Sequence, residues 1–192
     1  MGYLLWFLTK LIGRGLRPFR SNPGDVDVQR CLLITYCGAN NTGAEARTKI
    51  AIEQIRRSGR GKINMTAMAF NKKNMQRYIT EDKDLQIVEP RQALFFFDIA
   101  RLLLRSDMAL LIEGSGFREV FSSMMLWYFL YSLGLAQQIG LATIVYAADT
   151  GKLKKSNIFF TQRVLKRVDL LMMRNEQSRE QLIKWGVPCC NI

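Results

Sequence analysis

Short apolar runs alternate with longer segments of helical periodicity along most of the sequence. Such runs, bounded by polar or glycine-containing segments, predict β-strands. They lie at residues 31–36, 63–69, 85–88, 108–112, 142–146 and 170–173. The segments between them predict helices at about 44–58, 72–79, 92–105, 121–139, 155–167 and 176–185.

This alternation of strands and helices predicts the fold class. Strands separated by helices of about ten residues or more indicate parallel βαβ units with right-handed crossovers. Several predicted strands are apolar on both faces, as expected when helices cover both sides of a sheet. We therefore predict an α/β fold with a doubly wound, mostly parallel, Rossmann-like sheet over residues 25–188.

Residues 1–20 have a different pattern. At about 100° per residue, a helix here would carry Lys10, Arg14 and Arg17 on one face and apolar residues on the other, and Pro18 should end it. The apolar positions are Leu4, Leu5, Leu8, Leu11, Ile12, Leu16 and Phe19. This pattern predicts a helix lying on an anionic membrane surface; a helix packed on its own domain and a signal-peptide-like start are the alternatives. Residues 21–25, SNPGD, are expected to form a linker.

Residues 121–140 form the longest apolar segment and could be mistaken for a membrane span. Serines and glutamines interrupt the segment, and a predicted strand follows almost at once. A buried central helix is the better interpretation.

Composition and net charge limit the kinds of ligand or partner that the chain is expected to bind. The chain has 192 residues, of which 48% are hydrophobic, and a net charge of +12. That excess predicts attraction to anions such as phosphorylated metabolites or lipid headgroups. The cations are spread over several helices and loops, so we predict no binding of nucleic acid.

The chain has four cysteines and no histidine. No pair has the C-x-x-C spacing of a zinc site, and a serine or cysteine nucleophile activated by histidine is excluded. We predict no metal site, and reduced, structural thiols in a cytoplasmic protein.

The loop after the first predicted strand is the first candidate site. Gly38 and Gly43 permit tight turns, Asn41 can donate its side-chain amide, and Glu45 lies in the first turn of the next helix. The free N–H groups of that helix favour an anionic or oxygen-rich ligand. Equally, Thr42 can cap the helix and Glu45 can complete a capping box.

Loops after the fourth, fifth and sixth predicted strands are further candidate sites, at what should be the same edge of the sheet. Gly114, Ser115, Gly116 and Arg118 come after the fourth strand, where glycines expose backbone donors and the arginine can bind an anion, or can be solvated beside a simple turn. The later loops contribute Gly151, Arg174 and Ser178, with Lys152, Lys154 and Lys155 available for phosphate.

Four motifs, in this order, resemble the polysaccharide pyruvyl transferase family. They are N-T-G-A-E-A at 41–46, the segment from Asp107 to Gly116, the segment from Val145 to Gly151, and an R-x-x-x-S-x-x-x-L-x-x-x-G-V pattern at 174–187. The resemblance covers about residues 31–188. The chain carries Ala44 where family members often have aspartate, and it lacks the histidine expected in a second half.

The resemblance implies transfer of a pyruvyl group from phosphoenolpyruvate to a sugar of a cell-surface glycan or its lipid-linked precursor, without another cofactor. It also implies the N-terminal half of a GT-B arrangement at the cytoplasmic face of the membrane, with residues 189–192 starting a linker to a missing domain. Glu45 would be a base or hydroxyl acceptor and Arg174 a carboxylate or phosphate ligand. We expect this chain alone to be inactive.

Two alternatives remain at this stage. One is half of a GT-B glycosyltransferase that uses a nucleotide sugar. The other is a non-catalytic, membrane-associated binding module.

Overall fold

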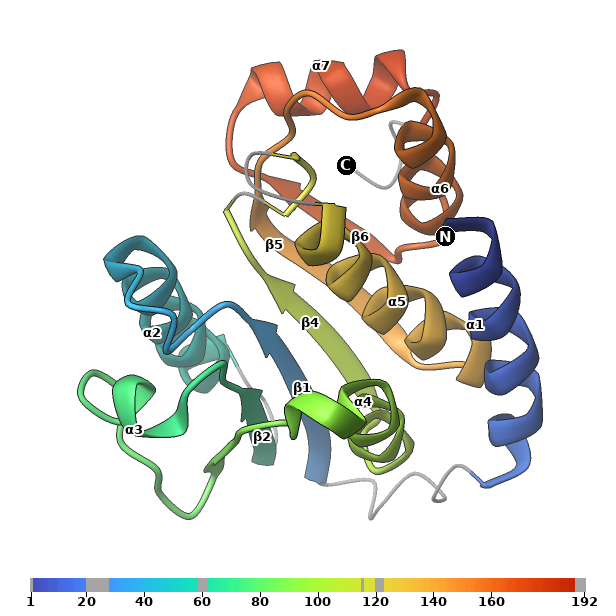
Figure 1. Ribbon diagram of the computed structural model, residues 1–192. Coiled ribbons are helices and arrows are strands. Elements are labelled where there is room, and N and C mark those ends of the chain that lie inside the picture. Colours follow the sequence, from blue (N-terminus) through green and yellow to red (C-terminus); the bar gives the residue numbers. More distant parts are fainter. Residues whose placement is uncertain (1, 20–27, 59–61, 115, 120–122, 189–192) are drawn as a thin grey trace.

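The sheet has the topology that the sequence predicts. A computed structural model describes residues 2–19, 28–58, 62–114, 116–119 and 123–188 (Figure 1). Its six strands are all parallel, in the order β3-β2-β1-β4-β5-β6. They are β1 (Val28–Thr35), β2 (Lys62–Met68), β3 (Leu85–Val88), β4 (Met108–Ile112), β5 (Ala142–Ala148) and β6 (Leu170–Met173). The α/β, Rossmann-like prediction is confirmed.

The helices also follow the predicted order. They are α1 (Gly2–Leu16), α2 (Thr42–Ser58), α3 (Lys72–Met75), α4 (Phe95–Leu104), α5 (Ser123–Ile139), α6 (Lys155–Leu165) and α7 (Glu176–Lys184), with short 3-10 turns η1 (Arg17–Phe19) and η2 (Gln92–Leu94). Helix α3 ends earlier than predicted, because the chain turns so that Ile79 returns to the core while Tyr78 stays exposed. The predicted helix at 92–105 begins as η2, where the Asp98 carboxylate accepts the Arg91 amide at 2.9 Å.

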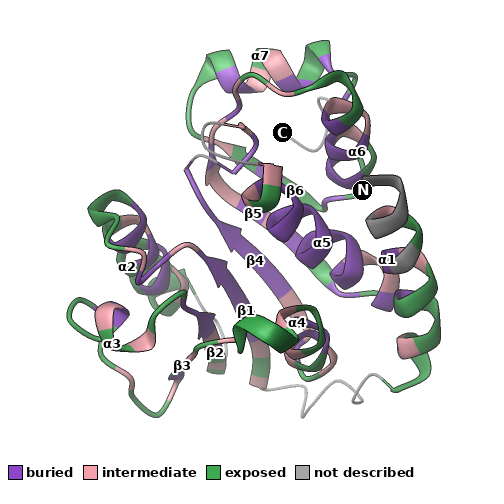
Figure 2. Cartoon of the chain, viewed as in Figure 1, coloured by how far each residue is buried: buried purple, intermediate pink, exposed green. Residues whose placement is uncertain are grey.

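Alternate strand residues supply two separate cores, one on each face of the sheet. Leu32 and Ile34 of β1 pack in the core that includes α4, α5 and α6. Cys31 and Leu33 face the other way and pack with residues of α2 and β2. In Figure 2 the central strand β4 is largely buried. Helices from the first strands and from the later strands therefore cover opposite faces.

Helix α5 is the central helix predicted from its apolar sequence. It is buried around most of its circumference (Figure 2), with Leu126, Phe129 and Leu133 at most 2% exposed. Among the residues that the structure describes, no helix combines the length and apolar character needed to cross a membrane.

Helix α1 packs on the domain along α5 and α6 (Figure 1), which agrees with one of the three interpretations of the N-terminal pattern. The predicted linker at 21–25 and the predicted start of a second linker at 189–192 lie outside the described residues.

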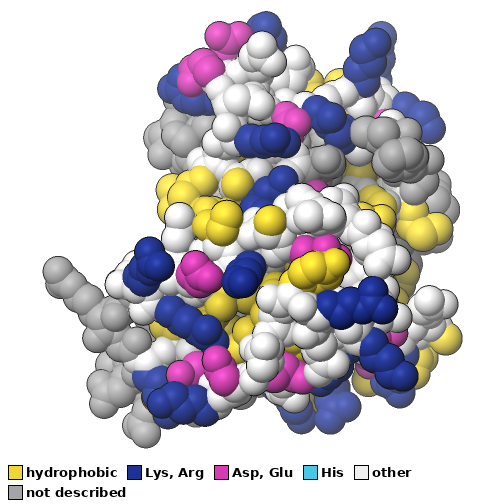
Figure 3. Space-filling view, turned by 90° about the vertical axis from the view of Figure 1, so that its left-hand side faces the viewer, with side chains coloured by type: hydrophobic (Ala, Val, Ile, Leu, Met, Phe, Trp, Pro, Cys, Tyr) yellow, Lys and Arg dark blue, Asp and Glu magenta, His cyan; other side chains and the backbone are white. Residues whose placement is uncertain are grey.

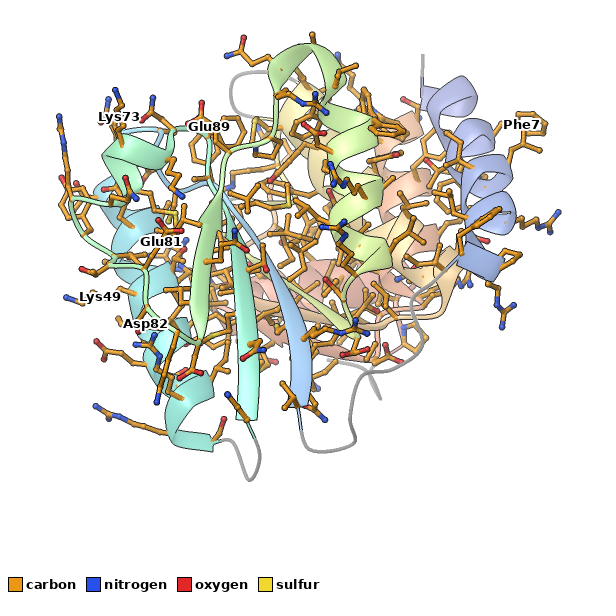
Figure 4. All side chains as sticks on the ribbon, turned by 90° about the horizontal axis from the view of Figure 1, so that it is seen from below. Phe7, Lys49, Lys73, Glu81, Asp82 and Glu89 are labelled. Carbon is orange, nitrogen blue, oxygen red and sulfur yellow. The ribbon has the colours of Figure 1, made fainter. Side chains whose placement is uncertain are left out.

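Charged side chains are distributed rather than grouped on the face shown in Figure 3. Lysines and arginines lie there among acidic and apolar side chains. In the view from below, Lys49, Lys73, Glu81, Asp82 and Glu89 extend from the α2 and α3 side of the molecule (Figure 4). This distribution fits the expectation that the positive charge is spread out.

Candidate functional site

The site lies where the direction of the strand order changes, between β1 and β4. These strands are neighbours, yet the helix after β1 lies on one face of the sheet and the helix after β4 lies on the other. The two loops therefore separate at the carboxyl edge, which is where ligands bind in open α/β sheets.

Backbone packing gives the loop after β1 its shape. Gly38 has φ +82°, and a Cβ there would lie 2.2 Å from the carbonyl oxygen of Asn71. Phe70 N donates to Cys37 O at 2.8 Å, so this loop is bonded to the loop after β2. Asn40 has φ 56°, the left-handed conformation that asparagine tolerates. Gly38 is therefore required by close backbone contact.

Asn41, rather than Thr42, caps helix α2. Its Oδ1 accepts the amides of Gly43 and Ala44 at 3.1 and 3.2 Å. The side-chain oxygen of Asn41 and the amide of Gly43 thus have partners within the helix start. Whether either residue also contacts a ligand stays a prediction.

The carboxyl group of Glu45 is buried and does not complete a capping box. The residue is 3% exposed, and its Oε1 is buried without a hydrogen-bond partner among the described residues. Leaving a buried polar atom unpaired costs about 1–3 kcal/mol, and more for a charged group. Native proteins keep few such atoms, and those that persist frequently mark function.

A second buried carboxylate, Glu113, follows β4 directly. It is 5% exposed, and its Oε1 lies 3.9 Å from Nη1 of Arg47 on α2. The Arg47 guanidinium lies against Gly114, where a Cβ would be 2.3 Å from Nη2. Gly114 therefore lets an arginine cover the carboxyl end of β4.

The Cys37 thiol lies within electrostatic reach of both carboxylates. Burial raises its pKa, hydrogen bonds from Thr48 and Thr35 lower it, and the charges of Glu45 and Glu113 raise it further. Its Sγ donates to the Ala44 carbonyl at 3.5 Å. A thiol with a raised pKa is a poor nucleophile, so Cys37 contributes packing rather than covalent chemistry.

Aromatic rings line the same edge on the α5 side. The Tyr36 and Phe70 rings are 4.8 Å apart, and Phe70 is 5.6 Å from Tyr128. The Tyr128 hydroxyl donates to the Thr35 carbonyl at 3.3 Å, and burial, with the charge of Glu113 next, raises its pKa. Phe70 is 40% exposed, so part of this aromatic surface is open to a ligand.

The loops after β4 and β5 are joined to each other. Phe117, fully buried, accepts the Gly151 amide at 3.0 Å and pairs in a parallel bridge with Thr150. Nearby, Arg118, Asp149, Thr150 and Ser178 form what we name the Asp149 cluster. Arg118 Nη2 lies 2.7 Å from Asp149 Oδ2, and Ser178 Oγ donates to Asp149 Oδ1 at 2.5 Å. Ser178 Oγ also accepts the Thr150 amide at 3.1 Å.

Glu119 joins the same loops to the start of α6. It accepts hydrogen bonds from the Lys154 amide at 2.7 Å, from Asn157 Nδ2 at 2.8 Å and from Ser123 Oγ. Burial opposes its charge, but these hydrogen bonds outweigh burial and lower its pKa. Arg118 and Glu119, which follow the glycines of the predicted loop at 113–119, therefore both have hydrogen-bond partners within the fold.

Arg174 lies at the end of β6, as predicted, but its side chain is exposed. Its backbone amide donates to Ala148 O at 2.8 Å, while its guanidinium has no hydrogen bond or ion pair with any described residue. Lys152, Lys154 and Lys155 are exposed near the same end of the sheet. These cations form an open rim, separated from β1 by β4 and β5.

The predicted site residues thus fall into two groups along one edge. Gly38, Asn41, Gly43 and Glu45 lie beside Gly114 at the β1–β4 end. Gly116, Arg118, Gly151, Arg174 and Ser178 lie towards β5 and β6. Ser115 lies outside the described residues.

Sequence reasoning missed several side chains of the site: Tyr36, Cys37, Arg47, Phe70, Glu113, Tyr128 and Asp149. Glu113 directly follows the predicted strand 108–112, and that position was a usable signal; Asp149 directly follows the observed β5, which is two residues longer than predicted. The part of the chain that the structure describes contains no group of three or more acidic or cysteine side chains able to hold a metal ion.

Comparison with known proteins adds little to this geometry. No protein-family model matches the sequence, and no curated protein is significantly similar to it. Among solved structures, the chain is similar to the enzyme WbmH of Bordetella bronchiseptica, in a crystal structure with NAD+. The two are 10% identical over 83% of this chain and 72% of that chain, with a TM-score of 0.38. A likeness this distant carries no functional argument.

Proposed function

We propose that this chain is the N-terminal, sugar-binding half of a polysaccharide pyruvyl transferase. The complete enzyme would transfer pyruvyl from phosphoenolpyruvate to a sugar of a cell-surface glycan or its lipid-linked precursor, at the cytoplasmic face of the membrane. The observation that carries the proposal is the buried Oε1 of Glu45, which lacks a partner among the described residues at the switch point of the sheet.

A sugar hydroxyl has the chemistry that this oxygen needs. A hydroxyl group donates one hydrogen bond, and a carboxylate is an acceptor only. Donation to Glu45 would offset the cost of burying an unpaired oxygen, so binding and folding would favour the same contact. Glu113, beside Arg47, supplies a second buried carboxylate, which like Glu45 lies near Cys37.

The aromatic surface fits a sugar as well. One face of a pyranose ring consists mostly of C–H groups, which pack on aromatic rings while the hydroxyl groups reach polar side chains. Tyr36 and the half-exposed Phe70 provide such a surface at the end of β1 and β2. Ligand sites commonly combine apolar walls with a few convergent polar groups.

The reaction then requires a base for the sugar and cations for the donor. One sugar hydroxyl adds to C2 of phosphoenolpyruvate while C3 is protonated; phosphate leaves, and a second hydroxyl closes the ketal. Glu45 would accept the proton of a hydroxyl group. Arg174, on the cationic rim, would bind the carboxylate or phosphate of the donor. Residues of a second half would complete this site.

A pair of isosteric variants tests the role of Glu45. Glu45→Gln and the control Glu53→Gln, an exposed position of the same helix, are compared with the unaltered chain. Binding of a panel of methyl glycosides is measured by saturation-transfer NMR, with and without phosphoenolpyruvate. We expect binding to fall about tenfold or more in Glu45→Gln only, while both variants unfold within about 1 kcal/mol of the unaltered chain.

Three outcomes would count against the proposal. Equal sugar binding by Glu45→Gln would remove the role of this carboxyl group. The absence of binding to every glycoside tested would remove the sugar site. Binding of a UDP-sugar in place of free sugars would support the glycosyltransferase alternative.

A further inference from the structure

Helix α1 contacts the domain through a face that combines the small residues Thr9 and Gly13 with Trp6 and Leu16. Thr9 is 3% exposed, and a Cβ at Gly13 would lie 2.3 Å from Cβ of Gln138 on α5. Trp6 packs beside Phe160 of α6, with ring centroids 6.1 Å apart, and Leu16 packs against the core. Because Gly13 has no side chain, α1 can lie close to α5 at this point.

Several large apolar side chains among the described residues of α1 and η1 are exposed. Phe7 is 62% exposed, Leu11 60% and Ile12 38%, and η1 adds Phe19 at 74%. Figure 4 shows Phe7 on the outer side of the helix, directed away from the sheet. At 100° per residue, Phe7 and Leu11 lie on the side of the helix opposite Thr9 and Gly13, and Ile12 lies between the two sides. A grouped, exposed apolar face of this kind marks an interaction surface.

Basic residues flank the apolar face. Lys10 lies over the Trp6 ring at 5.3 Å from its centroid, and Arg14 and Arg17 are exposed. Residues 1–19 include no aspartate or glutamate. An apolar strip bordered only by cations is complementary to a surface that offers hydrocarbon beside negative charge, which is an anionic lipid bilayer.

We propose that the outer face of α1, formed by Phe7, Leu11 and Ile12 with Lys10 and Arg14, binds the interface of an anionic membrane. The helix would lie in the membrane plane, with its apolar side chains among the acyl chains and its cations at the headgroups. This surface is separate from the β1–β4 site, and its function does not depend on the proposed pyruvyl transfer.

The position of α1 keeps the candidate site accessible while the helix is bound. The helix lies along α5 and α6, on the opposite side of the molecule from α2 (Figure 1). A membrane on this flank would leave the carboxyl edge of the sheet beside the bilayer rather than against it. Substrates could then reach the edge from the membrane surface.

Vesicle flotation of the full chain tests the apolar contribution. The chain is mixed with vesicles of phosphatidylcholine alone or of equal amounts of phosphatidylcholine and phosphatidylglycerol. The double variant Phe7→Ser/Leu11→Ser is compared with Ile50→Ser, which alters an apolar residue of α2 that is 50% exposed. We expect partitioning onto the anionic vesicles to fall about tenfold or more in the double variant, with no change in the control.

Charge reversal tests the electrostatic contribution. Arg14→Glu should weaken binding about fivefold or more, since a cation near an anionic membrane contributes about 1 kcal/mol, while Arg57→Glu on α2 should not. Added salt should weaken binding by the unaltered chain. Circular dichroism checks that the variants stay folded.

Two results would overturn this proposal. One is equal vesicle binding by the unaltered chain and the Phe7→Ser/Leu11→Ser variant. The other is sedimentation of the chain as a dimer that the double variant converts to a monomer, because a second copy would then cover this face.

Discussion

The two ends of the sheet's carboxyl edge carry similar residues, but their acidic side chains differ in the hydrogen bonds that they accept. Near β5 and β6, Asp149 accepts hydrogen bonds from Arg118 and Ser178, and Glu119 accepts three more. Between β1 and β4, Glu45 keeps a buried oxygen that no described residue contacts. Charged residues beside glycines therefore serve structure at one end and remain available for a ligand at the other.

This difference shows how a charged residue beside glycines in a loop should be interpreted. A carboxylate that has all its donors within the chain stabilises a loop, and a ligand would have to displace them. A buried carboxyl group that lacks a donor is destabilising until something else supplies one. Each variant below is chosen to break the contrast between the two ends or to make it sharper.

The largest expected effect is the loss of Asp149. Asp149→Ala removes the partner of the half-buried Arg118 and the acceptor of the Ser178 hydroxyl, and breaking such a pair costs about 3–5 kcal/mol. Urea denaturation measures the free energy of unfolding. The control Glu176→Ala breaks an exposed pair with Arg179 and should cost about 0.5 kcal/mol or less. Equal costs would show that the Asp149 cluster contributes no more than a surface pair.

Substitutions at Gly38 and Gly114 distinguish a glycine that the loop structure requires from one that affects ligand binding. In Gly38→Ala the new Cβ meets the Asn71 carbonyl oxygen at 2.2 Å in a left-handed conformation, so we expect a loss of about 2–3 kcal/mol. In Gly114→Ala the Cβ meets the flexible end of Arg47, which can move, so the cost should stay below about 1 kcal/mol. Urea denaturation gives both costs, and NMR gives the sugar binding. Binding should fall in Gly114→Ala; unchanged binding there would mean that the position of Arg47 is unimportant.

The last prediction concerns the pH dependence of the stability that Glu119 contributes. Its pKa is lower in the folded chain than in the unfolded one, so its stabilisation is present above the unfolded pKa, near 4.3, and is lost as the pH falls through the folded pKa. Glu119→Gln should cost about 1–2 kcal/mol at neutral pH, and this cost should diminish under acidic conditions. Urea denaturation across that range measures it. A cost that is constant with pH would contradict the linkage.

Most of the fold could be predicted from local patterns. The strands at Met108–Ile112 and Leu170–Met173 were predicted at their observed bounds, because each is a short apolar run with clear ends. Helix α3 was predicted too long, since its end depends on Ile79 returning to a core built by distant residues. Parallel order followed from the alternation of elements.

The site was predictable only in part, because long-range partners decide each residue's role. Arg118 and Ser178 were expected to bind a ligand, but both contact Asp149, which is 31 and 29 positions away along the sequence. Glu45 was identified from its place in the first turn of a helix. Its unpaired oxygen could not be predicted, because that depends on which side chains the fold brings near it.

The packing of the N-terminal helix likewise depends on long-range contacts that the sequence pattern does not predict. Its periodicity predicted an apolar face and a basic face, and the exposed Leu11 and Ile12 lie where that pattern expects them. Leu16, placed on the same apolar face by the pattern, packs against the core instead. The sequence pattern did not predict that Thr9 and Gly13 would contact the domain. That contact depends on the surface of α5, which the sequence of α1 does not reveal.

The two buried thiols have a practical consequence for measuring motion in this protein. Cys31 lies deep in the sheet, where burial raises its pKa to about 12, and Cys37 is buried in the loop after β1. In a chain with Cys189 and Cys190 replaced by serine, alkylation of Cys37 would report transient loosening of the loop after β1. Alkylation of Cys31 would report only disruption of the whole sheet, so the ratio of the two rates distinguishes local breathing from global unfolding.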